Sequence, residues 1–144
     1  MKKSNLNFLK PKKGNSLGQW LIENGISAGF PSPADDFKEI RISLDEELIK
    51  NKEATFYARV SGDSMQDAGL SDGDLIVIDR AINIENNKIC VCYLDGEFTV
   101  KRIIKRGRKL YLKPENKNYE EIEIKKDSEL IVWGIITFVI KSVK

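Results

Sequence analysis

From residue 55 onward the chain is a succession of short segments rich in β-branched and aromatic residues, separated by turns that contain glycine and aspartate. Such segments are typical of strands that bury one face or both. We expect strands over Thr55–Val60, Leu75–Asp79, Ile89–Leu94, Glu97–Ile104, Leu110–Leu112, Ile122–Ile124 and Leu130–Ile140. The pattern therefore predicts a compact, mostly β domain whose short strands are largely antiparallel.

Turn signals between these segments predict which strands are neighbours. Asp95-Gly96 is a strong signal for a two-residue hairpin between the strands on either side of it. A second hairpin is expected at the basic tip Lys105–Lys109. Solvation at a turn explains its cationic side chains better than contact with DNA or a protein. The apolar run Leu130–Ile140 predicts one buried strand, or two strands bent at Gly134.

The first part of the chain has a different character. Residues 1–15 are polar and basic, and we expect them to be mobile. Capping signals predict a short helix from Ser16 to Gly25 and another from Ser43 to about Lys50. Residues 26–36 contain two prolines and predict an extended linker. The expected organisation is a flexible N-terminal arm, residues 1–40, followed by one β domain, residues 41–144.

Composition narrows the class of protein. The net charge of +2 is too balanced to indicate a nucleic-acid or membrane-surface partner. Cys90 and Cys92 lie two apart, where a disulfide would be strained, so we expect reduced thiols and a cytoplasmic protein. Lysines near the N-terminus precede no apolar stretch, and the longest apolar run is far shorter than the about 20 residues of a membrane helix. We therefore expect no membrane partner.

Ser64 and Lys101 are the candidate catalytic residues. The chain contains no histidine, so a serine nucleophile here needs another base. A lysine buried deeply enough to lose its proton can take that role, and Thr99, on the same strand face, could orient its amine. Backbone N–H groups around Ser64 would then form an oxyanion hole. Composition and spacing leave the alternative open that both residues are ordinary solvated side chains.

Four aspartates near Ser64 raise the question of a metal site: Asp63, Asp67, Asp72 and Asp74. Their order lacks the spacing of a calcium-binding EF-hand loop and its terminal glutamate. Turn chemistry explains them better, and we expect neither a metal ion nor a cofactor.

Three motifs resemble the LexA/UmuD family of self-cleaving serine peptidases. Residues 61–75 look like the nucleophile region of the LexA-type proteins, and residues 95–102 look like their lysine strand. Residues 29–34 resemble the segment that follows the cleavage point in the UmuD branch, whose members are accessory subunits of a translesion DNA polymerase. The resemblance runs from about residue 20 to the C-terminus and implies a LexA-like peptidase fold.

The resemblance also implies a function. Ser64 would be the nucleophile and Lys101 the general base of a chain that cuts its own backbone between Ala28 and Gly29. In the family, a RecA filament on single-stranded DNA stimulates this cleavage as part of the SOS response. The shortened product, residues 29–144, would join a UmuC-type error-prone polymerase subunit in SOS mutagenesis. The expected partners are therefore a second copy in a homodimer, the RecA filament and that polymerase subunit.

Three rival functions each require a feature of their own. A LexA-like or phage-type repressor needs a DNA-binding domain, and the residues before the expected cut are too few for one, so no sequence-specific DNA binding is expected. A signal peptidase also uses serine and lysine but needs a membrane anchor. A β module that binds the polymerase or RecA without catalysis would lack self-cleavage.

Overall fold

The computed structural model describes residues 8–11, 19–22 and 39–143. The chain divides into two compact units, which are described separately. One unit joins residues 1–11 to residues 51–144 and carries the main sheet, whereas the other consists of residues 12–50. The expected boundary between arm and β domain at residue 40 stays a prediction.

The smaller unit contains a two-stranded antiparallel sheet, in which β2 (Gln19–Ile22) pairs with β3 (Glu39–Ile42). The helix predicted from Ser16 is therefore wrong over residues 19–22, because pairing with a distant segment overrides local capping signals. The second predicted helix is confirmed as α1 (Leu44–Leu48), and Ser43 is its N-cap residue. The Ser43 carbonyl accepts a hydrogen bond from the Glu47 amide at 3.0 Å, but the serine side chain makes no capping hydrogen bond.

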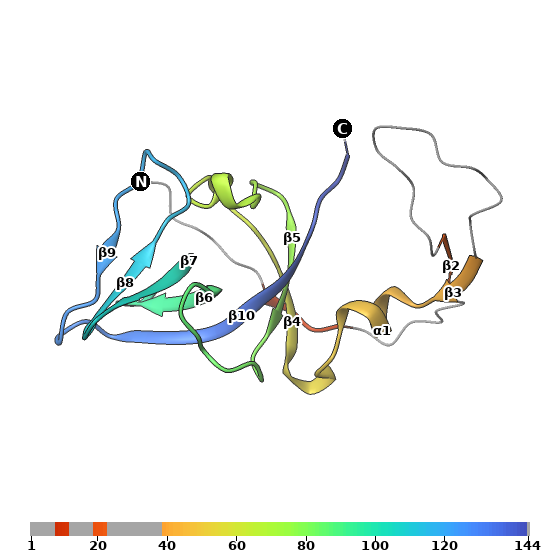
Figure 1. The fold of residues 1–144 in the computed structure, drawn as a ribbon, viewed down its shortest axis with the longest axis horizontal. Helices are drawn as coiled ribbons and strands as arrows, with labels where there is room; N and C mark the ends of the chain where they lie inside the picture. Colours follow the sequence, from red (N-terminus) through yellow and green to blue (C-terminus); the bar gives the residue numbers. More distant parts are fainter. Residues whose placement is uncertain (1–7, 12–18, 23–38, 144) are drawn as a thin grey trace. The chain divides into compact units, whose positions relative to one another are not determined.

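The larger unit is one antiparallel sheet of eight strands in the order β1-β4-β5-β10-β6-β7-β8-β9 (Figure 1). The strands are β1 (Phe8–Leu9), β4 (Thr55–Arg59), β5 (Leu75–Asp79), β6 (Ile89–Leu94), β7 (Glu97–Arg106), β8 (Lys109–Lys113), β9 (Ile122–Glu123) and β10 (Leu130–Ile140). The prediction of a mostly β, antiparallel fold is confirmed. Phe8 and Leu9 lie in the stretch expected to be mobile, yet they form an edge strand.

The long strand β10 joins the two halves of this sheet. Its first half pairs with β6 and its second half with β5, and Figure 1 shows it running between them. The register shifts between Val132 and Gly134 against β6, and again between Ile136 and Phe138 against β5. The run Leu130–Ile140 is therefore one bulged strand, as bulges let a strand bend without ending.

Two clusters of buried side chains form the core on this sheet. One gathers around β4, β5 and the loop between them: Ala58, Val60, Met65, Leu70, Ile76, Ile78, Val91 and Val100. The other lies over β6, β7 and β8 and contains Cys90, Cys92, Ile103, Leu112 and Ile135. Both cysteines are free, as predicted, with their sulfur atoms 3.0 Å apart.

Both predicted hairpins are present. Asp95 and Gly96 have φ angles of 48° and 89°, which match a two-residue turn with both central residues at positive φ. This turn fixes the register of β6 against β7, in which Cys90 is opposite Lys101 and Cys92 is opposite Thr99. The hairpin thereby determines which face of β7 carries Lys101.

Candidate active site

Ser64 lies in the loop between β4 and β5, and its side chain is half-buried. Gly62 begins the turn with a φ of 91°, and its amide donates to an oxygen of Asp72 at 2.8 Å. On the far side of Ser64, Met65 and Leu70 are each 2% exposed and anchor the loop in the core. This anchoring holds the serine in place on an otherwise exposed loop.

Lys101 lies in the middle of β7 and is 7% exposed. Its amine lies 3.1 Å from the Ser64 hydroxyl oxygen, 2.6 Å from the Thr99 hydroxyl oxygen and 3.0 Å from the Val100 carbonyl oxygen. The structure therefore brings together the two candidate catalytic residues and the threonine proposed to orient the amine. Three acceptors match the three protons of an ammonium, while the neutral amine can accept the serine proton through its lone pair.

Burial of Lys101 favours the neutral amine over the ammonium. Burial lowers the pKa of Lys101 below its ordinary value, and charge on the facing thiols of Cys92 and Cys90 would oppose this effect. The hydrogen bond to Cys92, together with burial, raises the pKa of the Cys90 thiol far above its ordinary range. At Lys101 the effect of burial is the largest, so the pKa of the amine is lowered.

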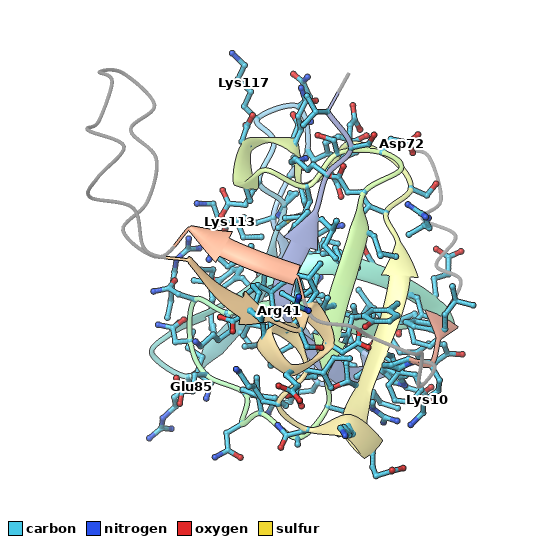
Figure 2. All side chains as sticks on the ribbon, turned by 90° about the vertical axis from the view of Figure 1, so that its right-hand side faces the viewer. Lys10, Arg41, Asp72, Glu85, Lys113 and Lys117 are labelled. Carbon is cyan, nitrogen blue, oxygen red and sulfur yellow. The ribbon has the colours of Figure 1, made fainter. Side chains whose placement is uncertain are left out.

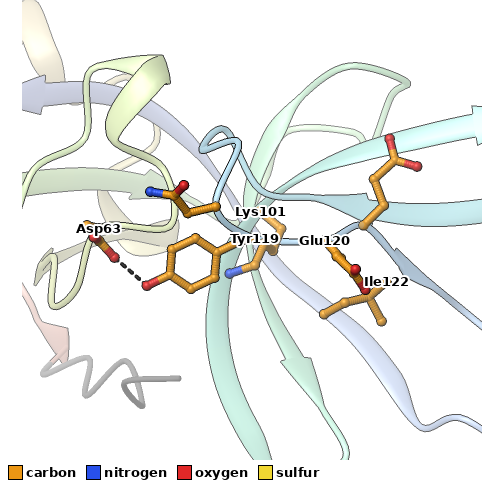
Figure 3. A pocket seen from close by; sticks show the side chains of 7 residues that line it. Asp63, Lys101, Tyr119, Glu120 and Ile122 are labelled. Carbon is orange, nitrogen blue, oxygen red and sulfur yellow. Dashed lines mark hydrogen bonds between the residues drawn. The ribbon is translucent and has the colours of Figure 1, made fainter.

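A cleft of about 630 Å³ opens beside the Lys101 amine (Figure 3). Its other lining residues are Asp63, Asn118, Tyr119, Glu120, Glu121 and Ile122. The Tyr119 hydroxyl donates a hydrogen bond to the Asp63 carboxylate, and this bond raises the pKa of the tyrosine. Such a cleft can admit a peptide segment next to Lys101, whose amine contacts Ser64.

The segment Glu115–Tyr119, named here the clamp, makes hydrogen bonds to the loop that carries Ser64, named here the serine loop. The Asn116 side-chain amide donates to the Asp63 carbonyl at 2.8 Å, and the Asp67 amide donates to the Glu115 carbonyl at 2.7 Å. The Glu115 amide also donates a hydrogen bond to the Met65 sulfur at 3.3 Å. Sequence reasoning missed the clamp. Its only signal was Pro114-Glu115-Asn116, which reads as an ordinary turn.

The predicted cleavage residues, Ala28 and Gly29, lie outside the described residues. The sequence contains a second Ala-Gly pair, Ala68-Gly69, which is fixed within the serine loop. Its two amides donate to the carbonyls of Met65 and Gln66 at 3.1 and 3.0 Å. This pair therefore stays in the loop that carries Ser64.

The described part of the chain contains no cluster of three or more residues suited to hold a metal ion. The helices within the described ranges are too short or too polar to cross a membrane.

Comparison with known proteins places the chain in a family. Residues 21–137 match the model for Peptidase S24-like proteins. Protein MucA from Salmonella typhimurium is 41% identical over 113 residues, which cover 78% of this chain and 77% of the relative. Protein ImpA from Shigella flexneri is 38% identical over 130 residues, which cover 90% of this chain and 88% of the relative.

A LexA repressor from Clostridium kluyveri is 42% identical over 97 residues, covering 67% of this chain but 48% of the repressor. The family expected from the three sequence motifs is thus confirmed, and the chain belongs to the S24 peptidase family.

Proposed function

We propose that this chain is a self-cleaving serine peptidase in which Ser64 is the nucleophile and Lys101 the general base. The observation that carries the proposal is the 3.1 Å separation between the Lys101 amine and the Ser64 hydroxyl oxygen, at a lysine that is 7% exposed. Membership of a peptidase family supports the same chemistry.

The proposed substrate is the chain's own bond between Ala28 and Gly29. The Ser64 oxygen attacks the Ala28 carbonyl carbon while the Lys101 amine takes the serine proton. Backbone N–H groups around Ser64 stabilise the oxyanion of the tetrahedral intermediate. That intermediate collapses as the ammonium returns its proton to the Gly29 nitrogen, which leaves as a new N-terminus. Water, deprotonated by Lys101, then hydrolyses the ester at Ser64 and regenerates the hydroxyl.

The proposed setting is the cytoplasmic SOS response. A RecA filament on single-stranded DNA would stimulate cleavage, and the processed chain, residues 29–144, would act as a homodimeric accessory subunit of a UmuC-type translesion polymerase. The resemblance of residues 29–34 to the UmuD branch supports this role. The similarity to MucA and ImpA extends over most of each protein, which supports a common role.

The test is the intact mass of the purified chain after incubation with an activated RecA filament, and separately at about pH 10, where lysine loses its proton without an activator. We expect two products, residues 1–28 and residues 29–144. Ser64→Ala and Lys101→Arg should both remain whole, since a guanidinium keeps its proton. Gly29→Lys should block the cut.

An unchanged mass under both conditions would favour a non-catalytic binding module instead. Cleavage of the Lys101→Arg chain would exclude lysine as the base. Normal processing of Gly29→Lys would move the cut to another bond.

The LexA match supports a second candidate, a repressor. Tight, sequence-specific binding to operator DNA in a gel shift would favour it.

A further inference from the structure

The edge strand β1 attaches Phe8 and Leu9 to the main sheet through β4. Phe8 pairs with Ala58 and Leu9 with Tyr57 in β4. The next residues, 12–50, form the other compact unit, and the chain rejoins the sheet unit at Asn51. β1 is therefore part of the sheet in space but is separated in sequence from all other strands of that sheet.

The Phe8 side chain supplies most of the apolar contact of β1. Its ring centroid lies 4.4 Å from that of Trp133 and 4.9 Å from that of Phe98. Phe56 completes the group, with its centroid 4.9 Å from that of Trp133. Leu9, by contrast, is 56% exposed. The Phe8 ring thus contacts Phe98 and Trp133, and Phe56 contacts Trp133; these three rings, Phe56, Phe98 and Trp133, are named here the socket.

Lys10, the residue after β1, adds polar contacts to this packing. The Lys10 amine lies 4.3 Å from the centre of the Phe56 ring and donates to the Glu53 carbonyl at 2.8 Å. Figure 2 labels Lys10 at this edge of the sheet. The Arg80 guanidinium lies 4.4 Å from the Trp133 ring and donates to the Trp133 carbonyl at 2.9 Å, which braces the ring from within the sheet unit.

We propose that the β4 edge and the socket of Phe56, Phe98 and Trp133 form a binding site for an extended peptide, here named the strand-acceptor site. Its ligand carries a phenylalanine and, two residues later, a lysine, and residues 8–10 are the occupant that the chain itself provides. Adding a strand to a sheet edge is an established way of binding peptides, in which backbone hydrogen bonds give affinity and side-chain sockets give specificity.

The geometry of β4 supports a site for exchangeable peptides. β4 contains five residues, and the register with β1 involves two of them, Tyr57 and Ala58. A short strand held by one ring and one ammonium is opened more easily than a strand with a long ladder. The binding of residues 8–10 depends on their tether, which gives them a high local concentration at the site.

This inference does not need the proposed cleavage, but it gains a consequence from it. A cut between Ala28 and Gly29 would leave β1 on the released piece. The segment would then lose its covalent tether, and the strand-acceptor site would open to a partner's extended peptide of the same pattern.

The test uses a fluorescent peptide with the sequence of residues 5–13 and the full chain carrying Ser64→Ala, so that the result is independent of cleavage. The parent chain carries Ser64→Ala alone, so its own residues 8–10 compete with the peptide for the site. A second chain also carries Phe8→Ala, which weakens this competition. We expect saturable binding by fluorescence anisotropy to the Phe8→Ala chain, about tenfold tighter or more than to the parent.

Matched peptides separate specific docking from attraction by charge. A peptide with Phe8→Ala keeps every lysine, and we expect it to bind about tenfold more weakly or worse. A peptide with Leu9→Ala should bind like the unaltered one, since Leu9 is 56% exposed. Equal binding of all three peptides would overturn the proposal, and so would the absence of binding to a Phe8→Ala chain that unfolds cooperatively on heating.

If the Phe8→Ala chain does not fold, the titration is carried out on the parent at higher peptide concentration. Saturable binding of the unaltered peptide, but not of the Phe8→Ala peptide, supports the site. The absence of such binding overturns the proposal.

Discussion

At the scale of single residues, one proton on Lys101 couples the proposed cleavage to pH. Burial lowers the pKa of this amine below 10.5, and only the neutral amine can take the Ser64 proton. We expect self-cleavage without an activator to accelerate as the pH rises and to level off below the pH at which a free lysine titrates. Intact mass followed over time at a series of pH values measures this profile. A rate that falls over the same range would contradict it.

The same proton predicts how stability depends on pH. Between the folded pKa of Lys101 and the ordinary value of 10.5, the unfolded chain binds the proton that the folded chain has released. The contribution of Lys101 to the free energy of unfolding therefore rises with pH across that window. Urea unfolding of Ser64→Ala, compared with Ser64→Ala plus Lys101→Met, isolates the effect. The difference between the two chains should shift with pH in favour of the one that keeps Lys101.

Thr99 should act as a positioning residue. Its hydroxyl oxygen lies 2.6 Å from the Lys101 amine, so Thr99→Val removes an acceptor and keeps the shape. We expect cleavage to slow about tenfold, which corresponds to the loss of about one hydrogen bond, and Thr99→Ser to restore it. The maximal rate should fall because the amine is less well positioned. The pH profile should shift toward lower pH, because the lost acceptor favoured the charged amine. A Thr99→Val chain with wild-type rate and profile would assign the threonine to packing alone.

At the scale of elements, the clamp should determine where Ser64 sits. Asn116 is 8% exposed and donates to the Asp63 carbonyl, so Asn116→Ala leaves that carbonyl without this donor. We expect a loss of about 1–3 kcal/mol in the free energy of unfolding and a cleavage rate lowered by about tenfold or more. Lys117→Ala, at an exposed neighbour, is the control. Cleavage at the wild-type rate in Asn116→Ala would show that the clamp is dispensable.

A side chain at Gly134 in β10 should destabilise the sheet, because a Cβ atom there has too little space. A Cβ atom there would lie 2.6 Å from Cγ2 of Ile78 and 3.2 Å from Cγ of Arg80. Ile78 is fully buried and has little room to move. We expect Gly134→Ala to cost about 1–3 kcal/mol by urea denaturation. Ile131→Ala, at a site in the same strand that is 58% exposed, is the control and should cost much less.

Elements differed in how well the sequence predicted them, and the difference follows from where their stabilising contacts lie. Leu75–Asp79 and Ile89–Leu94 form strands with the predicted bounds, because β-branched composition and adjacent turns are local signals. β2 was wrongly predicted as helix from local capping signals, because its partner β3 lies beyond residues 23–38 and local signals do not reveal such a pairing. Lys101 and Ser64 were identified as a pair by resemblance to a family. Asn116 was missed, since a buried asparagine in a turn is recognised only by what it contacts.

At the scale of the whole molecule, the length of chain between the proposed cut and the serine predicts the kinetic order of cleavage. Roughly 35 residues separate Gly29 from Ser64, enough to span on the order of 100 Å when extended. A tethered substrate is present at an effective concentration that dilution cannot change. We expect the half-time of cleavage at high pH to stay constant over about a hundredfold dilution of the protein. A half-time that lengthens in proportion to dilution would mean that freely diffusing copies cut one another. Mixing Ser64→Ala chains with Gly29→Lys chains would then identify that route, because only the first can be cut and only the second can cut.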